Sequence, residues 1–87
     1  GIIGSATAGQ WNSDQNMTWD AAGKVMKATL DLTAGEIKFR ANDDWAINLG
    51  GALNALTQGG DNIPIASAGN YTITLDLAAN KATIVKN

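Results

Sequence analysis

Residues 70–85, NYTITLDLAANKATIV, carry the clearest structural signal in the chain. Apolar and polar residues alternate from Tyr71 to Leu77, which is the period-two pattern of a strand with one buried face. The pattern resumes over residues 81–85, after the short segment 78–80 of two alanines and an asparagine. This spacing predicts a β-hairpin closed by a short loop.

The same alternation recurs towards the N-terminus and predicts further strands at residues 2–3, 24–32, 36–41, 45–49 and 62–65. Pro64 has no amide hydrogen, so the last of these strands is expected at a sheet edge. Two segments lack a strand pattern and are predicted as long loops, 4–19 and 50–61, with one helical turn over 52–56. About seven short strands separated by turn residues favour an all-β, antiparallel β-sandwich.

The apolar positions of these strands define a predicted core. In most of these strands one set of alternate residues is apolar while the other set is mainly polar or charged, so the apolar set should face the opposite sheet. The residues expected to be largely buried are Leu30, Ile37, Phe39, Ile73 and Leu75.

Composition excludes several classes of function. The 87 residues suffice for one small domain, and they include no His and no Cys. Ser–His and Cys–His catalysis and ordinary zinc, haem or iron–sulfur ligation are therefore excluded. Six Lys and Arg against eight Asp and Glu leave no basic surplus for nucleic acid. No apolar run approaches the roughly 20 residues of a membrane span.

Acidic clusters give only weak signals for a metal or for catalysis. Asp14-Gln-Asn16 looks like the first ligands of a calcium loop, but Trp19 and Val25 stand where such a loop needs Gly and Glu. A glycosidase needs two carboxylates across a cleft, and Asp43, Asp44 and Asp61 all lie in or beside polar loops. We therefore expect no catalytic residue, no bound metal and no cofactor.

Three of the five aromatic residues are tryptophans. Trp11 lies among small and polar residues, outside every apolar alternation. Trp45 follows the acidic turn 42–44, at the junction of a loop and a strand, and Trp19 could plug one end of the core. Trp11 could fold back over the end of the sandwich. Alternatively, an indole on a polar loop could present its flat apolar face to a sugar ring.

Three ordered motifs resemble a known family: Gly1–Trp11, Glu36–Gly51 and Ala68–Leu77. Together, and over essentially the whole chain, they resemble the starch-binding modules of the SusE and SusF outer-membrane lipoproteins. The resemblance implies an immunoglobulin-like β-sandwich module that binds starch-like α-glucan without catalysis. It also implies that residues 1–87 form one module of a longer, lipid-anchored surface protein associated with an outer-membrane glycan-uptake complex. The start at Gly1 rather than Met agrees with a piece of a longer protein.

The resemblance also indicates a ligand site. Trp11 and Trp45 match positions where platform rings are expected, and we expect them close together with their rings partly exposed. Lys38 and Arg40 should point outward from the strand that leads to Trp45, with their charges at the surface, as hydrogen-bonding partners for sugar hydroxyls. Asn48 and Asp43 are weaker candidates. The alternative is a structural spacer or protein-interaction module of the same fold, without a ligand.

Overall fold

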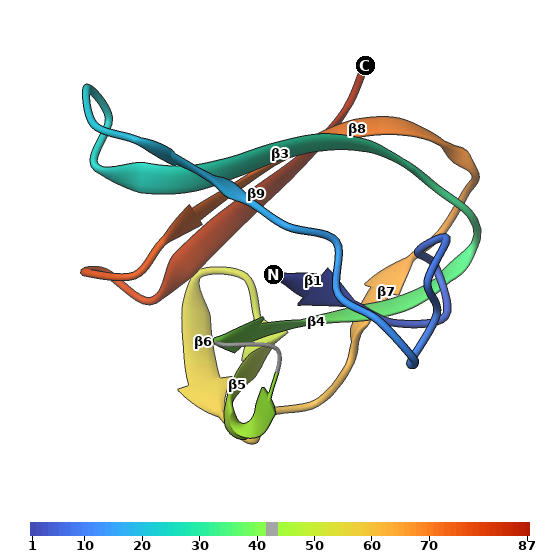
Figure 1. Cartoon of the computed structure of the whole chain (residues 1–87), viewed down its shortest axis with the longest axis horizontal. Coiled ribbons are helices and arrows are strands. Elements are labelled where there is room, and N and C mark those ends of the chain that lie inside the picture. Colours follow the sequence, from blue (N-terminus) through green and yellow to red (C-terminus); the bar gives the residue numbers. More distant parts are fainter. Residues whose placement is uncertain (42–43) are drawn as a thin grey trace.

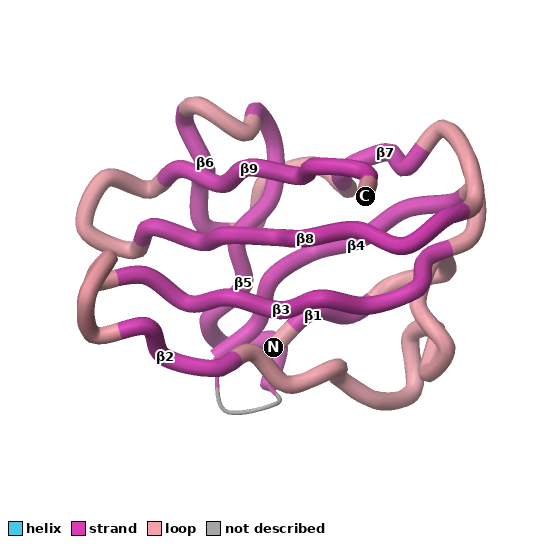
Figure 2. Tube along the Cα trace, turned by 90° about the horizontal axis from the view of Figure 1, so that it is seen from above, coloured by secondary structure: helices cyan, strands magenta, loops and turns pink. Residues whose placement is uncertain are grey.

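The computed structural model describes residues 1–41 and 44–87 as two antiparallel β-sheets packed face to face (Figure 1). One sheet has the order β1 (Ile2–Ile3), β4 (Gly35–Ala41), β5 (Asp44–Ala52) and β6 (Ala55–Gln58), and β7 (Ile63–Ile65) also pairs with β4. The other sheet has the order β2 (Thr18–Asp20), β3 (Val25–Leu32), β8 (Gly69–Asp76) and β9 (Lys81–Lys86). Figure 2 shows these last four strands side by side. The predicted all-β sandwich is confirmed.

The core lies between the two sheets, where the apolar phases of β4 and β8 face each other. Ile37 and Ile73 have no exposed surface, and Phe39 is 2% exposed. Leu75 is buried as well. Leu30 is only partly buried, so this one core prediction was too strong. Leu30 lies on β3 beyond Val25–Lys27, the short stretch that pairs with the three-residue strand β2.

The hairpin that the sequence predicted near the C-terminus is confirmed as β8 and β9, in register from Asp76↔Lys81 to Tyr71↔Lys86. The Pro64 strand is β7, which pairs with β4 at the start of that strand. Within the described residues, no helix has the length and apolar character needed to cross a membrane.

The segment 50–61 differs from its prediction as a loop with a helical turn. Its first part continues β5 to Ala52, and the chain returns as β6 after a turn at Leu53-Asn54. This turn also ties the two sheets together, because the Leu56 amide donates to the Asn80 carbonyl and the Ala82 amide donates to the Leu53 carbonyl, both at 2.8 Å. The sandwich is therefore joined along its β6–β9 side.

Candidate functional site

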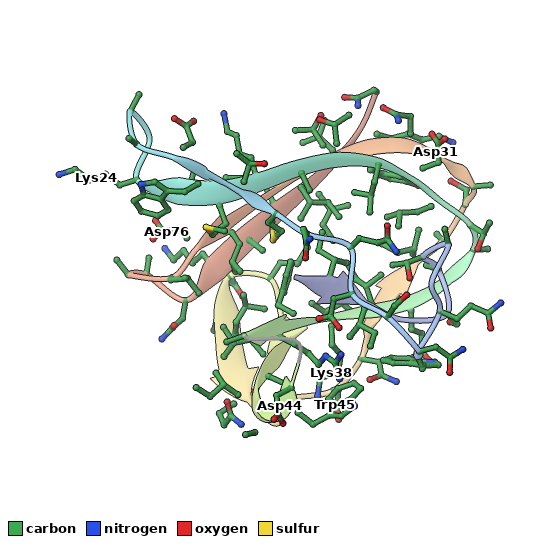
Figure 3. All side chains as sticks on the ribbon, in the orientation of Figure 1. Lys24, Asp31, Lys38, Asp44, Trp45 and Asp76 are labelled. Carbon is green, nitrogen blue, oxygen red and sulfur yellow. The ribbon has the colours of Figure 1, made fainter. Side chains whose placement is uncertain are left out.

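The outer face of β4 carries two cationic side chains. Because successive side chains of a strand point to opposite faces, Lys38 and Arg40 lie outside the sheet whose inner face holds Ile37 and Phe39. Arg40 pairs in register with Asn48 of β5. The Lys38 Nζ donates to the Asn48 Oδ1 at 2.6 Å. Figure 3 shows Lys38 pointing away from the β3–β8 sheet and towards Trp45.

An irregularity in β5 brings Trp45 onto this same face. Arg40 pairs with Asn48, whereas the next residue, Ala41, pairs with Asp44, so Trp45, Ala46 and Ile47 have no partners on β4. Such a bulge breaks the strict alternation of a strand and redirects side chains. In a regular strand over the predicted range 45–49, Trp45 would share a face with Ile47 and Leu49, but the bulge brings Trp45 to the outer face instead.

Side-chain amides hold the backbone of this bulge. The Asn48 Nδ2 donates to the Trp45 carbonyl at 2.8 Å. From β6, the Gln58 Nε2 donates to the Ala46 carbonyl and the Gln58 Oε1 accepts from the Asn48 amide, both at 3.1 Å. Backbone groups that lost their ladder partners are thereby satisfied, which makes the bulge a built feature.

Trp45 covers both cations. The Arg40 guanidinium carbon lies 4.8 Å from the centre of the Trp45 ring, and the Lys38 Nζ lies 5.8 Å from it. Both distances fall within the roughly 6 Å range in which a cation is attracted to an indole face. The indole remains 44% exposed. Since the cations come from the sheet below, the sheet side of the ring is occupied and the solvent side is open.

Trp11 reaches the site from a well-connected turn. The Gly4 amide donates to the Gln10 carbonyl at 3.0 Å, and the Asn12 amide donates to the Gly9 carbonyl at 3.1 Å. The start of the loop lies directly against β4, where a Cβ on Gly4 would collide with the Glu36 carbonyl. Trp11 is therefore carried beside the sheet, and it is 38% exposed. It does not fold back into the core.

The two indoles form a pair. Their ring centres are 5.9 Å apart and their planes are inclined by 33°. Each ring is more than one third exposed. The two rings were expected to lie close together and partly exposed, and in the structure they do so on the outer face of the β4–β5 sheet.

Asp14 connects the Trp11 loop to the cations under Trp45. Its carboxylate accepts from the Arg40 Nε at 3.1 Å and also from the Arg40 Nη2. Both partners are sheltered, with side chains 8% exposed for Arg40 and 1% for Asp14. The carboxylate considered above as a calcium ligand therefore serves as the partner of an arginine. Among the described residues, no group of three or more acidic side chains is placed to hold a metal ion.

The candidate residues from the sequence thus have different environments. Trp11 and Trp45 are exposed, whereas Lys38 is 8% exposed and Asn48 is 9% exposed. The expectation that the Lys38 and Arg40 charges lie at the surface is therefore wrong, because Trp45 covers them and Asn48 and Asp14 bind them. Asp43 lies outside the described residues. Sequence reasoning missed Gln58, for which no signal exists in its unpatterned segment.

A separate apolar cleft of about 230 Å³ opens between the ends of the two sheets. Its wall includes Met17, Met26, Leu75 and Leu77 from or beside one sheet, and Phe39, Arg40, Ile47 and Leu49 from the other. Neither Trp11 nor Trp45 lines it. The paired indoles therefore form an open surface rather than a pocket.

The comparisons with known proteins assign the family. Residues 1–84 match the family model described as SusF/SusE starch specific CBMs, and the chain belongs to this family of carbohydrate-binding modules. Searches of curated proteins and of solved structures gave no match.

Proposed function

We propose that this module binds starch-like α-glucan without catalysis, through a platform formed by Trp11 and Trp45. The observation that carries the proposal is the tilted pair of exposed indoles, 5.9 Å apart, in a chain of the SusF/SusE family. An indole packs its flat face against the C–H groups of a sugar ring while solvent or nearby polar groups meet the hydroxyls. Trp45 covers two cations on its sheet side, but the exposed faces of the paired rings are not used by the fold.

The tilt favours an α-linked ligand. Successive glucoses of an α-1,4 chain turn relative to one another and give the chain a helical bend, whereas β-1,4 chains form flat ribbons. Two rings inclined by 33° match a curved surface better than a flat one. If each stacked ring contributes on the order of 1–3 kcal/mol and polar contacts to the hydroxyls add to this, the dissociation constant should be modest, roughly 10 µM to 1 mM.

The buried polar residues have supporting roles in this proposal. Lys38, Arg40 and Asn48 form a layer below Trp45 that holds the ring in place, in addition to any contact with sugar hydroxyls at the rim. Family membership further supports a module without catalytic activity, exposed at the cell surface within a longer, outer-membrane-anchored protein that takes part in glycan uptake.

The test is titration of the module with maltoheptaose, followed by tryptophan fluorescence and calorimetry, for the native chain and three variants. Trp11→Ala and Trp45→Ala should each weaken binding by about tenfold or more. Trp11→Ala should leave the melting temperature nearly unchanged, whereas Trp45→Ala should lower it modestly, because it uncovers Lys38 and Arg40. Trp19→Ala is the matched control, because Trp19 is also exposed, at 55%, but lies on β2 of the other sheet. It should leave binding unchanged, and cellohexaose should bind more weakly than maltoheptaose.

One observation favours the alternative of a spacer or protein-interaction module. Ile47 and Leu77, at the apolar cleft, are each more than half exposed. If maltoheptaose produces no saturable change in the native chain, the glucan proposal fails and this alternative takes its place. Loss of stability with unchanged binding in the Trp11→Ala and Trp45→Ala variants would show that the indoles serve the fold.

A further inference from the structure

We infer that Asp14 is a positioning residue for the paired indoles: its ion pair with Arg40 fixes the Trp11 loop relative to Trp45. The inference rests on the proposed function for its consequence in binding, but the geometry it concerns is present without a ligand. Asp14 is not itself placed to bind a sugar, because its side chain is only 1% exposed.

The ion pair links the loop that carries Trp11 to the arginine that contacts Trp45. Asp14 follows Trp11 by three residues on the same loop. Its carboxylate binds the Arg40 guanidinium, whose central carbon is 4.8 Å from the centre of the Trp45 ring. One guanidinium thus contacts the loop of the first indole through a carboxylate and the face of the second indole directly.

The chemistry of the pair suits it to fixing an orientation. Two nitrogens of one planar guanidinium bind the two oxygens of one carboxylate, an arrangement that restrains direction as well as distance. The pair is also sheltered from water, so solvent screens it far less than it screens an exposed pair. By contrast, the Lys27–Asp20 pair at 3.2 Å has side chains 50% and 31% exposed.

Backbone hydrogen bonds hold this loop within itself and at its two ends, where Ala6 donates to Glu36 of β4 at 3.2 Å. Gln15, next to Asp14, exchanges two backbone hydrogen bonds with Ile2, at 2.7 and 2.8 Å. The turn that contains Trp11 is bonded mainly within itself and to Gly4. Because Trp11 lies between these two anchors, the Asp14–Arg40 pair adds a direct side-chain tie from its end of the loop to the outer face of β4.

The experiment compares Asp14→Asn with the native chain by two measurements. The first, without ligand, is the exciton couplet that two close, non-parallel indoles give in far-ultraviolet circular dichroism. Trp11→Phe identifies the contribution of this pair. The second is the dissociation constant for maltoheptaose. Asp14→Asn should remove most of the couplet and weaken binding roughly tenfold, about the contribution of one ring, while the variant stays folded.

Asp20→Asn is the matched control, because it breaks the exposed ion pair beside Trp19 and should change neither measurement. If Asp14→Asn does not fold, because it removes the Asp14 carboxylate from a sheltered guanidinium, the double variant Asp14→Asn/Arg40→Gln replaces the charged pair by a neutral one. An unchanged couplet in either folded variant would overturn the inference, since the backbone would then hold Trp11 unaided. The two conclusions can fail separately. If the native chain binds no maltoheptaose but Asp14→Asn still loses the couplet, the proposed function is refuted and the positioning role stands.

Discussion

Removing the Asn48 side chain should cost more stability than removing Asn48 and Lys38 together. Asn48→Leu deletes the hydrogen bond from the buried Lys38 ammonium, at 2.6 Å, and the bond to the Trp45 carbonyl, at 2.8 Å. A hydrogen bond to a charged group contributes about 1.5–3 kcal/mol and one between neutral groups about 0.5–1.5 kcal/mol. The single variant should therefore lose roughly 2–4.5 kcal/mol, out of about 4–13 kcal/mol for 87 residues.

The double variant Lys38→Met/Asn48→Leu removes the ammonium that the single variant leaves unpaired. Only the Trp45 carbonyl then loses a donor, so the loss should fall to about 0.5–1.5 kcal/mol. Urea unfolding followed by circular dichroism gives both values, and the double variant should be more stable than Asn48→Leu by roughly 1.5–3 kcal/mol. Asn70→Leu is the control, because Asn70 also donates to a charged group, Asp31 at 2.9 Å, but in an exposed position. A double variant that is no more stable than Asn48→Leu would refute this account of the layer below Trp45.

Three further outcomes are expected. Phe39→Ala should cost roughly 3–5 kcal/mol in urea unfolding, because the ring is 2% exposed, and Leu30→Ala should cost less because Leu30 is only partly buried. EDTA should not lower the melting temperature, and incubation with amylose should release no reducing ends. The pKa of Asp20 is lowered by its bond to Lys27 and by the Gly23 amide. The small contribution of Asp20 to stability should therefore be present above the ordinary aspartate pKa of about 3.9 and lost as the pH falls through the lowered value. Acid titration of Asp20→Asn should not show this loss.

Most of the fold could be predicted because one physical rule governs it. Where polar and apolar residues alternate, as in β4 and β8, burial of one face fixes both the strand and its phase. The rule fails in segment 50–61, where Ala, Gly, Leu and Thr give no clear alternation. There the strand β6 forms a hairpin with β5 without guidance from alternation, while the backbone bond from Leu56 to Asn80 is a contact distant in the sequence.

The site was less predictable for two physical reasons. Alternation requires Trp45 to share a face with Leu49, and only the bulge, with its Gln58 amide from another strand, redirects the ring. Alternation also locates Lys38 on the outer face without revealing what covers it. Whether an outward cation is solvated or lies beneath an indole depends on side chains from other strands and loops, and no local pattern records that.

The strand β4 explains how so small a domain can hold two tryptophan rings in a fixed arrangement. Its residues alternate between the core and the layer below Trp45, so Ile37 and Phe39 anchor from behind the backbone that presents Lys38 and Arg40 in front. A slip of one residue would place the cations in the core and the apolar side chains under the indole, which makes that register costly to change. Burial of Phe39 therefore restrains Arg40, and Arg40 in turn contacts Trp45 and binds the Trp11 loop through Asp14. The apolar core thus supplies the rigidity that an open platform, with no pocket walls around it, lacks on its own.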